Sequence, residues 1–211
     1  MPSIELETDY SAHQQQTLLS LACDSIRHGF EYNRPLQIEL AKSPAWLTEK
    51  HASFVTLKTG DGLRGCIGTL EARAALGDDV AKNAWAAAFR DPRFPPLAPE
   101  EMSGLTLQIS ILSIPEKIEF TSEQELVDKL RSGIDGLILS DRSARGTFLP
   151  SVWETLPDPA IFLRQLKLKA GLAADYWSDS IGVMRYSTET FSELVDNIEK
   201  AGLSYRSAVL K

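Results

Sequence analysis

The sequence predicts a mixed fold of helices and strands, either α+β or α/β with antiparallel strands. Segments with the 3.6-residue period of an amphipathic helix are interleaved along the 211 residues with short segments of strand type. Several neighbouring strand segments are separated by turns of only a few residues, which are too short for the crossover that parallel strands need. The composition, 43% apolar and 24% charged, is that of a globular chain.

The first half of the chain contains two predicted helices and a hairpin. Apolar residues that recur every three to four positions predict helices over residues 11–30 and 78–90. Strand-forming residues on both sides of Gly60-Asp61-Gly62 predict a β-hairpin of segments 52–58 and 63–70. The second helix ends at Asp91-Pro92, because the residue before a proline disfavours the helical conformation.

The second half alternates further strands and helices. Capping signals predict where three helices begin, namely Ser122 with Glu125, Asp158 with Pro159, and Thr190 with Glu193. In chain order, the elements predicted here are strand 105–112, helix 121–131, strands 136–140 and 146–149, helix 158–171, strand 181–186 and a last helix that begins at Thr190.

Charge and residue counts exclude several classes of protein. The net charge of −7 argues against a nucleic-acid binder that relies on bulk positive charge. Two cysteines and three histidines exclude a four-cysteine zinc site and a disulfide framework, and the histidines lack ligand spacing. We therefore predict neither metal nor cofactor, because phosphate-binding loops and nucleophile elbows are missing too. No signal peptide and no apolar run of membrane-spanning length is found, so we expect a cytoplasmic protein without membrane contact.

Cys66 is the first candidate for chemistry, within Leu63-Arg-Gly-Cys-Ile-Gly68. On a strand, Arg64 and Cys66 lie on the same face with Cα atoms about 6.5–7 Å apart, and a guanidinium at that distance favours a nucleophilic thiolate. Gly65 and Gly68 indicate a bulge or the close approach of a ligand or another backbone. The alternative is a small buried cysteine on a hairpin, with a helix packed across the glycines.

Asp91 and Arg93 form the second candidate, between a helix end and a run of prolines. Arg93 suits an anionic group, and Asp91 suits a role as its orienting partner or as a base. The alternative is a turn held by a local salt bridge. Cys23, by contrast, lies on the apolar face of the first helix and is predicted to be structural.

The heptapeptide Leu63-Arg-Gly-Cys-Ile-Gly-Thr69 closely resembles the signature of the AMMECR family, which includes AmmeMemoRadiSam system protein A. Further motifs follow in the order of that family, over about residues 12–195. They are Asp91-Pro-Arg-Phe-Pro-Pro-Leu97, Leu107-Gln-Ile-Ser110 with Pro115, Gly146-Thr-Phe-Leu-Pro150, Phe162-Leu163, Lys169-Ala-Gly-Leu172 and Trp177. One departure is visible at Asp135, because many members have histidine before the glycine that follows.

The resemblance implies an α+β fold with an antiparallel sheet flanked by helices. It also implies two unequal lobes, with the N- and C-terminal parts sharing the larger lobe and the cysteine motif near a cleft between lobes. We therefore expect residues 1–211 to form a single AMMECR-type domain, with a smaller lobe within about 115–180. The system's name implies Memo-like and radical-SAM proteins as partners.

Two functional hypotheses follow. In the first, the protein is an enzyme in which Cys66 is the catalytic nucleophile and Arg64 its activator. Asp91 and Arg93 then clamp a small-molecule ligand in the cleft, near Gly65 and Gly68. In the second, the protein is a non-catalytic adaptor that presents the glycine-rich strand and the proline-rich loop to its Memo-like and radical-SAM partners. Nucleic acid is the least favoured partner, because of the acidic charge.

Overall fold

The computed structural model describes residues 10–202 and residue 205. The chain forms two compact units, one of Met1–Ile111 with Glu189–Lys211 and the other of Leu112–Thr188. Each unit has its own four-stranded antiparallel sheet with helices, so the α+β prediction is confirmed. The C-terminal part of the chain returns to the first unit, where it supplies one strand of the sheet.

The sheet of the first unit has the strand order β2-β1-β3-β8, which makes β2 an edge strand. The predicted hairpin is present, and its register pairs Thr56 with Cys66. The strands are β1 (Ala52–Thr59), β2 (Gly62–Gly68), β3 (Leu105–Leu112) and β8 (Thr188–Leu194).

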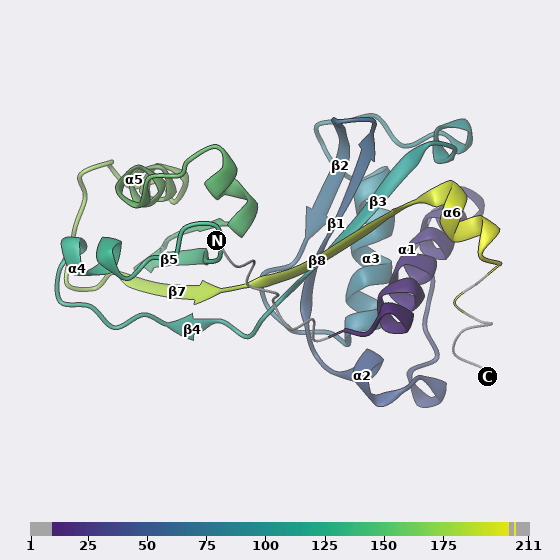
Figure 1. The fold of residues 1–211 in the computed structure, drawn as a ribbon, viewed down its shortest axis with the longest axis horizontal. Coiled ribbons are helices and arrows are strands. Elements are labelled where there is room, and N and C mark those ends of the chain that lie inside the picture. Colours follow the sequence, from purple (N-terminus) through teal and green to yellow (C-terminus); the bar gives the residue numbers. More distant parts are fainter. Residues whose placement is uncertain (1–9, 203–204, 206–211) are drawn as a thin grey trace, which may run out of the picture. The chain divides into compact units, whose positions relative to one another are not determined.

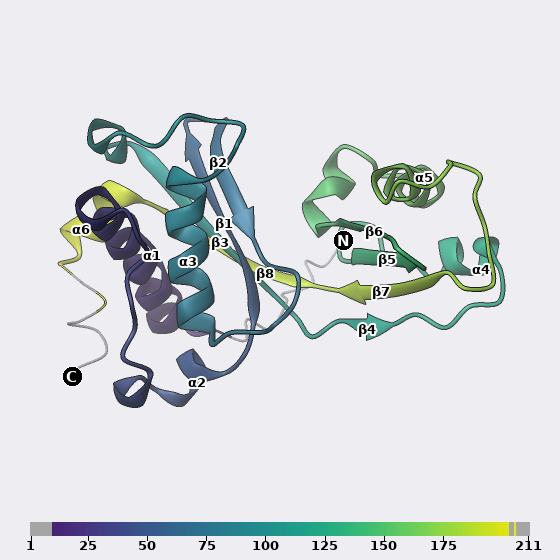
Figure 2. The same ribbon diagram turned by 180° about the vertical axis from the view of Figure 1, so that it is seen from behind.

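Two long helices, α1 (Ala12–Tyr32) and α3 (Leu76–Phe89), lie side by side on one face of this sheet (Figure 1). The view from behind shows the same layering, with α3 in front of the strands (Figure 2). Helix α1 begins at the N-cap Ser11, whose hydroxyl accepts a hydrogen bond from the Gln14 N–H. The shorter helices of this unit are η1 (Leu40–Lys42), α2 (Ala45–Thr48), η2 (Pro99–Met102) and α6 (Val195–Lys200).

The core of the first unit lies between the helices and the sheet. From Leu105 to Ile111 of β3, buried and half-buried residues alternate, as expected when one face of a strand meets a core. Val55 and Leu57 of β1 are fully buried and join Leu18 and Ile26 of α1 in one apolar cluster. Thr56, which lies between Val55 and Leu57 in β1, points to the opposite face of the sheet.

The second unit is built around the strand order β4-β7-β5-β6, in which neighbouring strands pair antiparallel. Its core includes Trp153 stacked on Phe162, with the ring centroids 3.7 Å apart. Its elements are β4 (Glu116–Lys117), α4 (Glu123–Asp128), β5 (Gly136–Asp141), β6 (Ala144–Phe148), η3 (Pro150–Glu154), α5 (Pro159–Lys169) and β7 (Gly182–Tyr186).

Two sequence predictions about helix starts need correction. The predicted helix start at Thr190 is wrong, because residues 188–194 form β8 and the helix begins only at Val195. The alternation of half-buried and exposed residues along β8 fits a strand that pairs with β3. At α4, Ser122 caps the helix as predicted, but the Glu125 carboxylate binds the N–H and hydroxyl of Thr121, so the reciprocal half of the capping box is absent.

Candidate functional site

Cys66 lies on the edge strand β2, and its side chain is half-buried. The preceding residue, Gly65, faces α3, since a Cβ placed there would lie 2.2 Å from the Ala87 carbonyl oxygen. Side chains alternate along a strand, so Cys66 points to the face away from that helix. There the hydroxyl of Thr56 donates a hydrogen bond to the Cys66 sulfur at 3.3 Å.

Asp91 follows the end of α3, and its carboxylate is almost completely buried against β2. One oxygen accepts the backbone N–H of Cys66 at 2.8 Å, and the carboxylate also binds the Arg93 guanidinium at 2.6 and 2.9 Å. These bonds, that from Arg93 foremost, hold the pKa of Asp91 well below its usual range. Asp91 is therefore an anion that holds Arg93 in place and binds a backbone N–H at the edge of the sheet.

Arg93 is the cation that reaches Cys66. Its Nη2 donates to the Cys66 carbonyl at 3.2 Å, which places the guanidinium next to this residue. The bond to Asp91, with a smaller contribution from Cys66, raises the pKa of Arg93. About half of the Arg93 side chain (53%) is exposed, so the guanidinium remains accessible to an anion from solvent.

Arg64 is directed elsewhere. Its guanidinium binds Glu101 at 2.6 and 2.9 Å and the carbonyl of Pro95 at 3.1 Å. This pairing raises the pKa of Arg64 and lowers that of Glu101. Arg64 thus ties β2 to the proline-rich segment, and its role as the activator of Cys66 stays a prediction.

At Gly65 and Gly68, the space that a side chain would take is filled by other atoms of the protein. At Gly65 the backbone of α3 approaches closely, as described above. At Gly68 a Cβ would lie 2.3 Å from Cγ of Phe54 and 2.6 Å from the Ser53 carbonyl oxygen. These contacts give both glycines a packing role in the folded chain, and binding of a ligand at either remains a prediction.

A buried polar cluster next to the heptapeptide was missed by the sequence reasoning. The carboxylate of Asp79 accepts the N–H and hydroxyl of Ser53, the hydroxyl of Thr69 and the amide of Asn83, all within 2.7–2.9 Å. Burial raises the pKa of Asp79, against the lowering effect of these bonds. The available signal was the spacing of Asp79 and Asn83, four residues apart on the apolar face of α3.

Two further residues named in the sequence analysis, Cys23 and Asp135, are buried inside the two units. Cys23 is buried in the core of the first unit, and desolvation raises the pKa of its thiol to about 12. In the second unit, the fully buried Asp135 pairs with Arg131 at 2.6 Å and with Arg185 at 3.5 Å. Two arginines therefore pair with the one buried carboxylate of Asp135.

Two absences hold for the described part of the chain, residues 10–202 and 205. Within it, no three or more histidine, cysteine or acidic side chains gather in a way that suits a metal ion. The helices there are all too short or too polar to cross a membrane.

Comparison with known proteins gives one consistent family. The family model AMMECR1 matches residues 19–191. A protein of Thermofilum pendens is 35% identical over 199 residues, covering 87% of this chain and 91% of that protein. A protein of Methanocaldococcus jannaschii is 36% identical over 166 residues, with 75% and 81% covered. The crystal structure of an uncharacterised protein from Pyrococcus horikoshii superposes with a TM-score of 0.76 at 33% identity, over 84% of this chain and 90% of that one.

Proposed function

Because this chain belongs to the AMMECR1 family and carries a cation next to Cys66, we propose that it is an enzyme, or a component of an enzyme system, whose reactive group is the Cys66 thiol. The observation that carries the proposal is the position of Arg93, which Asp91 fixes and which contacts Cys66. Reactive cysteines are typically partly exposed and lie near a cation. Cys66 is half-buried, and the Arg93 guanidinium binds its carbonyl.

Each neighbour of the thiol has a distinct role in this proposal. Asp91 is a positioning residue, because it holds both the Cys66 N–H and the Arg93 guanidinium. The Thr56 hydroxyl donates to the sulfur and so orients it. The exposed edge of Arg93 then receives an anionic group of the substrate, a carboxylate or a phosphate, next to the sulfur.

The experiment compares two disulfide reagents of different charge on the Cys23→Ser protein, in which Cys66 is the one remaining cysteine. Ellman's reagent is a dianion, and 4,4′-dithiodipyridine is neutral. We expect Arg93→Gln to slow the reaction with the dianion about five- to tenfold relative to the neutral reagent, since the anion loses its partner. The neutral reagent reports any change in the exposure of the sulfur.

The matched control is Arg90→Gln, which removes the same charge three residues earlier. Arg90 directly follows α3, and its guanidinium lies over the ring of Trp85 in that helix, 5.2 Å from the ring centroid. If Arg93→Gln and Arg90→Gln change the ratio of the two rates equally, Arg93 does not recruit anions to Cys66 and the proposal fails.

A second candidate function is the adaptor role, with Memo-like and radical-SAM proteins as partners. What favours it is that hydrogen bonds of Arg64, Asp91 and Arg93 join the backbone of β2 to the proline-rich segment and the residues before it. Size-exclusion chromatography with these partners tests it, and no co-elution at micromolar concentration counts against it. Cys66→Ser separates the two functions, because an adaptor keeps its partners when the thiol is lost.

Both cysteines are free thiols, which suits the reducing cytoplasm proposed for the protein.

A further inference from the structure

The face of the first sheet that points away from α1 and α3 carries a lysine close to Cys66. Thr56 of β1 lies on this face, and so do Cys66, which pairs with Thr56, and Lys58, two residues further along β1. Residues two apart on a strand have Cα atoms about 6.5–7 Å apart. Gln108 of β3 shares the face, because its amide oxygen accepts a hydrogen bond from the Lys58 ammonium at 3.1 Å.

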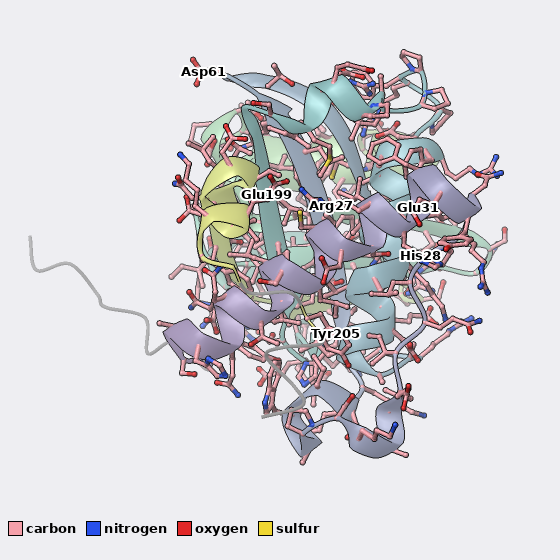
Figure 3. All side chains as sticks on the ribbon, turned by 90° about the vertical axis from the view of Figure 1, so that its right-hand side faces the viewer. Arg27, His28, Glu31, Asp61, Glu199 and Tyr205 are labelled. Carbon is pink, nitrogen blue, oxygen red and sulfur yellow. The ribbon has the colours of Figure 1, made fainter. Side chains whose placement is uncertain are left out.

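The four strands supply no carboxylate to this face. Their acidic residues are Glu189 and Glu193, both in β8. Phe191, between them, packs against the core under the helices, so both glutamates point to the helical side as well. Glu189 there accepts a hydrogen bond from Gln15 of α1. In the hairpin turn, Asp61 projects from the end of the strands, away from the sheet (Figure 3).

Two carboxylates that reach β2 from other segments are already paired with arginines. Glu101 binds Arg64, and Asp91 binds Arg93. Within residues 10–202 and 205, Lys58 forms no ion pair, and its hydrogen bond goes to a neutral amide. Lys58 is half-buried, and a half-buried cation without a counterion favours the binding of an anion.

An anion at Lys58 would meet hydrogen-bond donors from two strands. The ammonium has three N–H groups, of which one binds Gln108. Because an ammonium can only donate, the amide oxygen of Gln108 faces it, and the two N–H groups of that amide can donate to an anion alongside.

We propose that Lys58 and Gln108 bind the phosphoryl group of a small phosphorylated substrate, next to the Cys66 thiol. A phosphoryl group has three acceptor oxygens in different directions for donors from two strands, whereas a carboxylate has two in one plane. That the phosphoryl group belongs to the substrate of Cys66 rests on the function proposed above. The anion site itself does not depend on a reactive thiol.

The test is a titration of the full-length, isotope-labelled protein with inorganic phosphate at constant ionic strength, followed by the side-chain amide resonances of Gln108. We expect a saturable shift, and weaker binding of acetate. Lys58→Gln should weaken phosphate about tenfold or more, because a charge-assisted hydrogen bond is lost. The matched control is Lys82→Gln, which removes the same charge from an exposed position of α3 and should leave the affinity unchanged.

A second variant keeps Lys58 and fills the site from within. In Gln108→Glu, followed by the backbone amide of Lys58, the new carboxylate should pair with the ammonium in place of the anion, so that phosphate no longer binds. The position beside Cys66 is tested on Cys23→Ser, in which phosphate should slow the reaction of Cys66 with 4,4′-dithiodipyridine. This protection should be lost when Lys58→Gln is added.

The proposal is overturned if the shifts do not saturate, if acetate binds as well as phosphate, or if Lys58→Gln binds phosphate as the wild type does. It is also overturned if phosphate does not protect Cys66. Arg93→Gln separates this site from the proposed function. If Arg93→Gln leaves both the disulfide reactions and the Lys58-dependent phosphate binding unchanged, the proposed function fails and the phosphate site stands.

Discussion

At the scale of single residues, Gly65 shows how closely α3 is packed on the strand that carries Cys66. We expect Gly65→Ala to lower the free energy of unfolding by about 1–3 kcal/mol or more, because backbone atoms of α3 must move to admit the Cβ. Gly62→Ala on the same strand is the control, since its Cβ would meet no atom closer than 3.4 Å. Urea denaturation of both variants measures the difference, and equal losses would contradict the packing role of Gly65.

Two buried carboxylates of the first unit are expected to respond to pH with opposite signs. The pKa of Asp91 is lowered in the folded protein, so its stabilising contribution is present at neutral pH and is lost as the pH falls below about 4 and through that lowered value. The pKa of Asp79 is raised by burial, so the folded state takes up this proton first and gains stability as the pH falls. As the pH falls, the wild type should therefore lose stability relative to Asp91→Asn. Relative to Asp79→Asn, the wild type should gain stability.

The measurement is the free energy of unfolding of wild type, Asp91→Asn and Asp79→Asn between pH 3 and 7. Asp61→Asn, in the exposed turn of the hairpin, serves as the control and should run parallel to the wild type. Curves for Asp91→Asn and Asp79→Asn that diverge from the wild type in the same direction would refute the assignment.

At the scale of elements, β2 is an edge strand whose outward peptide groups are bound by side chains from the segment that follows α3. We expect Asp91→Ala to accelerate hydrogen exchange at the Cys66 amide about tenfold, because that N–H loses its acceptor. The amide of Leu57, on the central strand β1, should be unaffected. An unchanged rate at Cys66 would mean that Asp91 does not protect this edge.

Local patterns predicted most elements, and they failed where distant residues decide the outcome. The hairpin, α1, α3 and β3 follow from periodicity and turn residues close together in the sequence. Thr190 and Glu193 have the spacing of a capping box, which is typical of a helix start. The segment is nevertheless a strand, because it pairs with β3, about eighty positions earlier. In the same way, the strand spacing of Arg64 and Cys66 was compatible with a direct pairing, but Glu101, 37 residues later, binds the guanidinium. No local pattern could have shown that Asp91 and Arg93 would meet the peptide groups of Cys66.

At the scale of the whole molecule, the second unit is an insertion whose two ends meet. Ser113 and Ser187 are joined by two hydrogen bonds of 2.9 and 3.0 Å, so the chain enters and leaves this unit at one place. The unit has its own core, which includes Trp153 stacked on Phe162, and its own ion pair between the buried Lys167 and Glu123 at 2.6 Å. Close ends and a separate core are what an independently folding unit requires.

We therefore expect a fragment of residues 112–188 to fold alone and to unfold cooperatively in urea, with near-ultraviolet circular dichroism from its stacked aromatic rings. Trp153→Ala in the same fragment should abolish both signals, because it removes the stack and leaves a cavity that costs about 3–5 kcal/mol, comparable to the stability of so small a core. A fragment that lacks near-ultraviolet signal even before Trp153 is changed would show that the first unit is needed for the second to fold. In that case the two sheets would form one cooperative domain despite their separate cores.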